Sequence, residues 1–79
     1  MNPAKQNIVA IIIRYDGLLQ RYARIIINNE QVAAQLVRDV FEEYYTQAQK
    51  VPPQQLRSFL KNHTMTACCQ WLLAQVRKS

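Results

Sequence analysis

The sequence has little glycine, few acidic residues and no long hydrophobic run. Its 79 residues include one Gly, three Pro and 49% hydrophobic residues. This composition is typical of a compact helical domain and excludes a disordered tail. The apolar stretch at residues 8–13 is followed by Arg14 and Asp16, so it is too short to cross a bilayer, and no signal peptide is recognised. We expect one small cytoplasmic domain over residues 1–79, with no membrane insertion.

Cysteine and histidine are also scarce, which argues against metal centres and catalysis. The two cysteines, Cys68 and Cys69, are adjacent. This spacing suits neither an ordinary disulfide nor a zinc site, so reduced thiols are expected. With one histidine and no Gly-rich phosphate loop, a nucleophile, a base and an orienting group cannot readily be assembled. Glu42 and Glu43 diverge by about 100° on a helix and form no paired acid and base. We predict no enzymatic activity, no cofactor, no metal and no small-molecule substrate.

Two interruptions divide the chain into three segments. At Asn28-Asn29 an Asn side chain can cap a following helix by accepting backbone N–H bonds. At Pro52-Pro53 proline stops one helix and can open the next. The segments are predicted to be helices over about residues 3–27, 30–49 and 53–76.

Each segment repeats apolar residues at steps of three and four, which is the spacing of an amphipathic helix. The first segment has Ile8, Ile11, Ile12, Tyr15, Leu18, Leu19, Tyr22, Ile25 and Ile26. The second has Val32, Leu36, Val40, Phe41, Tyr44 and Ala48, and the third has Leu56, Phe59, Leu60, Ala67, Cys68, Trp71 and Leu72. Outside the isoleucine runs no segment alternates in the manner of a strand. We therefore expect an all-α bundle of three helices, or of four if Gly17 bends the first.

Acidic residues are unevenly placed in this basic chain, whose net charge is +5. Residues 1–27 carry a net charge of +3, residues 28–49 carry −3 and residues 50–79 carry +5. In the second segment Arg38 to Glu42 is a favourable pair and Asp39 to Glu43 an unfavourable one, each by a few tenths of a kcal/mol. Helix stability therefore does not explain the acidic cluster. Two interpretations stay open: a solvated helix face, or a docking face for a basic partner.

Several motifs occur in an order and spacing that are typical of one family. The run QLVRDVF at residues 35–41 is similar to the family's D-L-V-Q-E-V-F. The run SFL at residues 58–60, followed by WL at 71–72, is similar to the aromatic-Leu pairs of its third helix. Over about residues 8–78 the chain resembles region 2 of the bacterial sigma-70-type RNA polymerase sigma factors, especially the compact extracytoplasmic-function group.

The resemblance implies a transcription initiation factor domain that binds core RNA polymerase and the promoter minus-ten element. In that family the second helix docks on the clamp helices of the polymerase's largest subunit. The matching polymerase-binding residues share one helical face and are Gln35, Arg38, Asp39 and Glu42. Asp39 matches the family's carboxylate. Gln35 and Arg38 stand where the family often has Asp and Gln, so this face is less acidic than usual.

In the same family the third helix contacts promoter DNA as the strands separate. The residues implied here offer cations for phosphates or polar groups for bases, and they are Arg57, Lys61, Asn62, Thr66, Gln70, Arg77 and Lys78. Met65 and Thr66 replace a polar pair such as Arg-Asn. Met65, Cys69 and Leu73 are spaced i, i+4, i+8, so they form an apolar stripe on the side that the family turns toward DNA. Trp71, Tyr45 and His63 are interpreted as packing residues and not as base-stacking platforms or ligands.

An alternative function is that of a degenerate sigma-like domain in protein–protein interaction, either held by an anti-sigma factor or self-associating. It is based on the apolar stripe and on the isoleucine triplets at 11–13 and 25–27. Three consecutive isoleucines span most of a helix circumference and cannot all face a small core. The chain ends at Ser79, where compact sigma factors continue, and it lacks the helix-turn-helix second half, region 4. We expect it to be a fragment of a longer protein.

Overall fold

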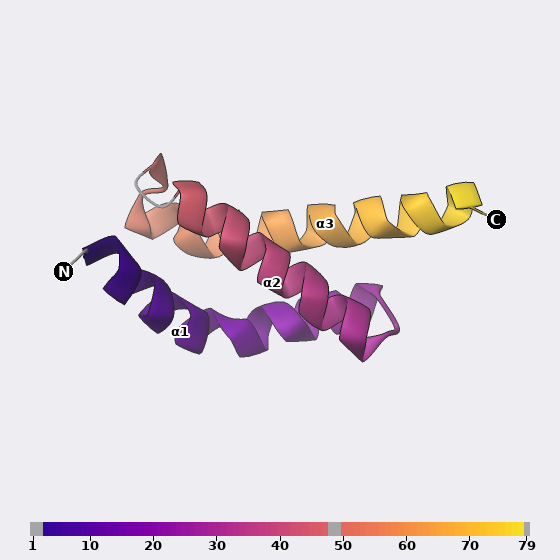
Figure 1. The fold of residues 1–79 in the computed structure, drawn as a ribbon, viewed down its shortest axis with the longest axis horizontal. Helices are drawn as coiled ribbons and strands as arrows, with labels where there is room; N and C mark the ends of the chain where they lie inside the picture. The colour runs from indigo at the N-terminus through magenta and orange to yellow at the C-terminus, as the bar shows by residue number, and fades with distance from the viewer. Residues whose placement is uncertain (1–2, 48–49, 79) are drawn as a thin grey trace.

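The protein is an all-α bundle of three helices, as predicted. The computed structural model describes the backbone of residues 3–47 and 50–78, and the side chains of residues 8–47 and 50–78. The helices are α1 (Pro3–Ile26), α2 (Glu30–Gln47) and α3 (Leu56–Lys78), and a 3-10 turn, η2 (Pro53–Gln55), precedes α3. α1 is one continuous helix that bends along its length (Figure 1). The described parts of the chain contain no strand.

The break between α1 and α2 is made by an asparagine cap. Asn29 accepts the backbone N–H of Val32 on its side-chain oxygen, at 3.1 Å, and the N–H of Ala33 on its carbonyl, at 2.9 Å. The first bond satisfies a donor that the first turn of a helix leaves unpaired, and the second is the first regular backbone bond of the helix. Ile27, one residue past α1, donates its N–H to the Ala23 carbonyl at 2.7 Å and is buried. Both ends of the short connection between α1 and α2 are therefore held in place.

The break before α3 is made by proline, and it too follows the prediction. Pro52 has an extended backbone, with φ −61° and ψ 145°, and Pro53 begins η2. The N–H of Gln55 bonds to the Pro52 carbonyl at 2.9 Å, and Leu56 then adopts helical dihedrals. Proline fits the start of a helix because its missing N–H would have no partner there.

A single core lies between the three helices. Its buried members are Leu19, Ala23, Ile27, Ala33, Val37, Val40, Phe41, Tyr44, Leu60, Thr64 and Cys68. Most of the predicted apolar positions are buried or packed against this core. Ile25 and Ile12 are different, since they are 77% and 37% exposed, and Leu72 is 38% exposed. Ala48 lies outside the described residues.

The three helices pack on one another in every pairing, and α3 continues past the other two (Figure 1). The bundle measures 47 × 21 × 21 Å. Trp71 is the last residue of α3 that packs against the core, and residues 72–78 are all exposed. At 1.5 Å per residue these seven residues extend the helix by about 10 Å. The protruding end of α3 is thus accessible from most directions.

Candidate functional site

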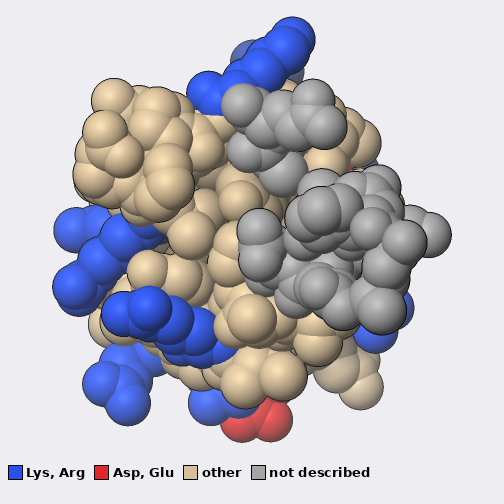
Figure 2. Space-filling view, turned by 90° about the vertical axis from the view of Figure 1, so that its left-hand side faces the viewer, with Lys and Arg blue, Asp and Glu red and all other residues tan. Residues whose placement is uncertain are grey.

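Charge is divided among the helices according to sign. α2 holds four of the five acids against one base, Arg38, whereas α3 holds four bases and no acid. All of these side chains are exposed. Figure 2 shows the end of the bundle where α1 begins and α2 ends, with Lys and Arg around much of its outline and acidic atoms only at the lower edge. The opposite net charges of the α2 and α3 segments are thus carried by exposed side chains.

The four residues implied for polymerase binding lie together on the outside of α2. Gln35, Arg38, Asp39 and Glu42 are all exposed. The Gln35 side-chain N–H donates to the Asp39 carboxylate at 2.9 Å, which holds that carboxylate on the helix surface. Among the described residues Arg38 and Glu42 form no ion pair, so both groups are available to a partner.

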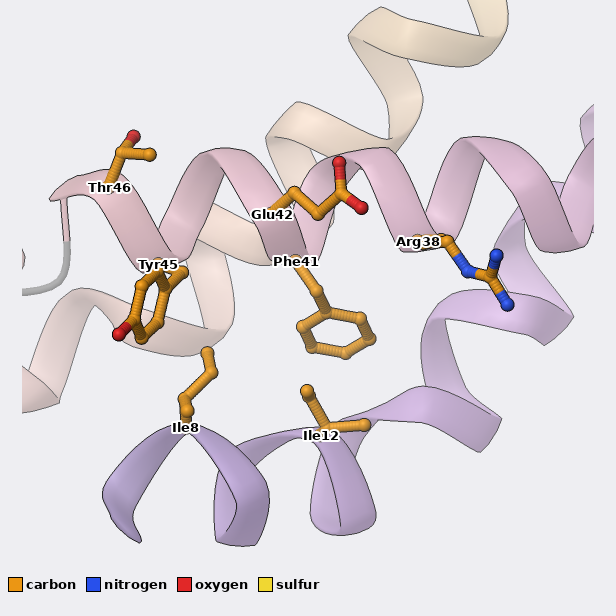
Figure 3. Close-up of a pocket in the computed structure, with 7 residues that line it drawn as sticks. All are labelled: Ile8, Ile12, Arg38, Phe41, Glu42, Tyr45 and Thr46. Atoms are coloured by element: carbon orange, nitrogen blue, oxygen red, sulfur yellow. The ribbon is translucent and has the colours of Figure 1, made fainter. Parts of the chain in front are cut away.

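Arg38 and Glu42 also border an apolar groove between α1 and α2. The groove has a volume of about 460 Å³ and is lined by Ile8, Ile12, Arg38, Phe41, Glu42, Tyr45 and Thr46. In Figure 3 the rings of Phe41 and Tyr45 point down from α2 toward Ile8 and Ile12 of α1. The sequence indicated only the charged rim. Phe41 and Tyr45, spaced i and i+4 beside Arg38 and Glu42, were the signal for the apolar floor.

Glu43 does not belong to this docking face, because it turns toward α3. Its carboxylate lies 3.4 Å from His63 Nδ1. The His63 ring stacks on Phe59 with centroids 4.0 Å apart, and Phe59 meets the edge of Tyr44 at 5.7 Å. His63 is therefore a packing residue that joins α2 to α3, as predicted. Burial also raises the pKa of Tyr44 above its ordinary value.

The residues implied for DNA binding are all exposed, but they lie on different sides of α3. Lys61 lies on the α1 side, with its Nζ 5.4 Å from the Tyr22 ring, and Arg57 precedes it by one turn. Thr66 and Gln70 follow the turn of His63, which faces α2. Nine residues separate Lys61 from Gln70, which places them about 180° apart around the helix.

The remaining members extend this division along α3. Arg77 falls on the Gln70 side, seven residues later, while Asn62 points outward between the two sides. Arg57 and Lys61 thus form one cationic pair, and Arg77 with Lys78 forms a second pair at the far end. A single strand of nucleic acid would have to cross the outer face of α3 to meet both pairs.

The outer face of α3 carries the predicted apolar stripe. Met65 is 41% exposed, Leu73 is 56% exposed, and Cys69 between them is exposed as well. Leu72 and Val76 widen the stripe toward the end of the helix. Cys68 is fully buried in the core, and this burial, with Cys69 beside it, raises the pKa of its thiol. Trp71 packs against the core, while Tyr45 is 41% exposed at the groove between α1 and α2.

Three further observations concern metal sites, membrane spans and similar proteins. No group of three His, Cys, Asp or Glu side chains in the described part of the chain is close enough to hold a metal ion. Within residues 3–47 and 50–78, no helix is both long and apolar enough to span a membrane. Comparison with protein-family models, with curated proteins and with solved structures gives no match.

Proposed function

We propose that this chain is a binding domain of a transcription initiation factor, similar to region 2 of a sigma factor, with no chemistry of its own. α2 binds the clamp helices of the largest polymerase subunit. α3 contacts the minus-ten strand of the promoter. The observation that carries the proposal is the division of exposed charge between an acidic α2 and a wholly basic α3.

The groove beside Arg38 and Glu42 offers a partner apolar contacts, which the charged residues alone do not. Complementary charge chiefly raises the association rate and fixes the register of two partners, while apolar contacts provide much of the affinity. A basic partner helix that presents one apolar side chain can place it against Phe41 and Tyr45 and its cations near Asp39 and Glu42. Docking of this kind uses the exposed face of α2 together with Ile8 and Ile12 of α1.

Nucleic-acid contact is assigned first to Arg57 and Lys61. They lie one turn apart on the same side of α3, so they can contact adjacent phosphates. Asn62 is next to them on the outer face and is the nearest polar group for an unpaired base. Thr66, Gln70, Arg77 and Lys78 stay in the proposal as a second set of contacts on the other side.

The proposal is tested by measuring binding of the isolated polymerase clamp helices to charge variants of α2. Asp39→Arg reverses a charge at the centre of the docking face. Glu30→Arg makes the same change in charge at the opposite end of α2 and serves as the matched control. We expect Asp39→Arg to weaken binding at least about tenfold and Glu30→Arg to have little effect. Equal loss in the two variants, or none in either, would contradict docking through this face.

A second candidate function is protein–protein interaction through α3, in which a regulator of the anti-sigma kind or a second copy is bound. The specific observation in its favour is the exposed apolar stripe of Met65, Cys69 and Leu73. Sedimentation over a range of concentrations separates the two forms of this candidate. A monomer with no tendency to associate excludes self-association and leaves a different partner.

A further inference from the structure

The outer face of α3 is a continuous ridge with a cation at each end. Lys61, Met65, Cys69, Leu73 and Arg77 follow one another at steps of four, and all five are exposed. Residues at this spacing form one of the ridges by which helices pack. Sixteen residues separate Lys61 from Arg77, which corresponds to about 24 Å along the axis. Each step of four residues turns by about 40°, so the ridge crosses the outer face obliquely. It is apolar in its middle, and Lys61 and Arg77 lie at its two ends on opposite sides of the helix.

The shape and length of this ridge fit a helix. The groove between α1 and α2 is separate from it, since none of the residues that line that groove comes from α3. Leu72 and Val76 lie beside the ridge and are 38% and 70% exposed. The exposed apolar side chains thus extend over more than two turns on the part of α3 that the bundle does not cover. An amphipathic helix binds such a surface through residues spaced three and four apart.

The charges on α3 disfavour pairing of the ridge with the same ridge of a second copy. Pairing two copies in parallel would place Lys61 beside Lys61 and Arg77 beside Arg77. Antiparallel pairing centred on Cys69 would place Lys61 beside the Arg77 of the other copy. Like charges meet in both arrangements, and α3 has no acid to offset them.

We propose that the α3 ridge binds an acidic amphipathic helix of another protein. That helix presents an apolar seam to Met65, Cys69 and Leu73, with an Asp or Glu near each end and on opposite edges of the seam, where it meets Lys61 at one end and Arg77 at the other. This inference rests on the second candidate function and is independent of docking through α2. The partner is thus defined by its chemistry, which is an apolar seam flanked by acidic residues.

The probe is a synthetic helical peptide with a leucine seam and Glu flanks, compared with the same peptide carrying Lys for Glu. We expect the acidic peptide to bind the intact chain at least about tenfold more tightly than the basic one. A double variant, Met65→Ser with Leu73→Ser, removes apolar area without altering charge and is expected to weaken binding about tenfold. Ile13→Ser removes an apolar side chain of α1 that is 77% exposed and is the control.

The outcomes distinguish this proposal from its competitors. Unchanged binding in the double variant, or an equal loss with Ile13→Ser, would overturn it. A dimer that the double variant dissolves would assign the ridge to a second copy, which also overturns it. Tight binding of a single-stranded oligonucleotide that the double variant weakens, together with equal affinity for the acidic and the basic peptide, would assign this ridge to nucleic acid and overturn the proposal. Asp39→Arg should leave peptide binding intact, so failure of polymerase docking does not affect the result.

Discussion

Thr64 brings a hydroxyl group into a core that is otherwise formed by apolar side chains. It is fully buried, and its hydroxyl donates to the Leu60 carbonyl at 2.8 Å. That carbonyl already accepts the N–H of residue 64 in the regular helical pattern. The hydroxyl is therefore satisfied, but no other group depends on it. Leu60 differs, because its side chain fills core volume and nothing can replace it.

Replacing Thr64 by Val is predicted to change stability little. Val keeps the branched shape, and the Leu60 carbonyl keeps its backbone bond, so the expected change in unfolding free energy is within about 1 kcal/mol. Leu60→Ala leaves a cavity and is expected to cost about 2–5 kcal/mol, enough to unfold much of a small domain. Urea denaturation followed by circular dichroism measures both. A large loss in Thr64→Val would show that the hydroxyl has a further role.

Two buried side chains that can lose a proton, the Cys68 thiol and the Tyr44 phenol, predict how stability depends on pH. The pKa of Cys68 is raised by burial and by Cys69, and that of Tyr44 by burial. The folded state thus holds these protons more tightly than the unfolded state, so the unfolding free energy falls as pH rises through their ordinary pKa values. We expect lower stability at about pH 10 than at about pH 7. Tyr44→Phe keeps the ring and should show a smaller decrease, whereas an unchanged profile would contradict this assignment.

At the scale of helices, the sequence was sufficient to predict number, order and approximate ends. Asn29 and the Pro52-Pro53 pair act locally, through a side-chain cap and a missing donor, so their effect does not depend on the rest of the fold. Burial of particular residues was less predictable. Ala23 is small and Thr64 is polar, so neither interrupts nor completes an apolar pattern, although both are fully buried.

The isoleucine triplets show why periodicity alone cannot assign the core. In the second triplet Ile25 is 77% exposed while Ile27 is fully buried. Three consecutive isoleucines spread over about 200° of the helix circumference and give the hydrophobic pattern little direction, so the direction of the core is set by where α2 and α3 lie. The helix also ends at Ile26, and Ile27 reaches the core from the connection that follows it.

Gly17 provides a test of helix propensity in α1. It lies within the helix, and a Cβ placed on it would meet no atom within 4 Å. Gly17→Ala is therefore expected to stabilise the fold by about 0.5–1 kcal/mol. Ala34→Gly on the exposed side of α2 should destabilise it by a similar amount. Thermal unfolding compares the two, and destabilisation by Gly17→Ala would mean that the bend of α1 requires glycine.

Over the whole molecule, the charge difference between α2 and α3 could be predicted from the sequence because the acids cluster in the second segment and the third has none. The groove between α1 and α2 could not, since it requires residues about thirty positions apart, such as Ile12 and Phe41, to be brought together. The division of the DNA-contact residues between two sides of α3 follows from the nine-residue spacing of Lys61 and Gln70. This division can be calculated from the sequence alone, once the third segment is taken to be a helix.

The cationic pair on α3 predicts how binding of a single strand depends on salt. Each phosphate contact contributes about 0.7 to the slope of log affinity against log salt for single strands. Lys61→Ala should therefore reduce that slope by about 0.7 for a minus-ten oligonucleotide, as measured by fluorescence anisotropy. Arg14→Ala removes the same charge from α1 and should leave the slope unchanged. Equal reductions would indicate attraction by net charge alone.

The central claim is that two oppositely charged helices let one small domain bind a polymerase surface and a promoter strand at the same time. The most direct test is to immobilise the clamp helices, capture the protein and then add a labelled minus-ten single strand. We predict that the captured protein retains the strand. Asp39→Arg should abolish capture, yet bind the strand in solution as the unaltered chain does. Release of the protein from the clamp helices by the strand would contradict the account, because both partners would then share one surface.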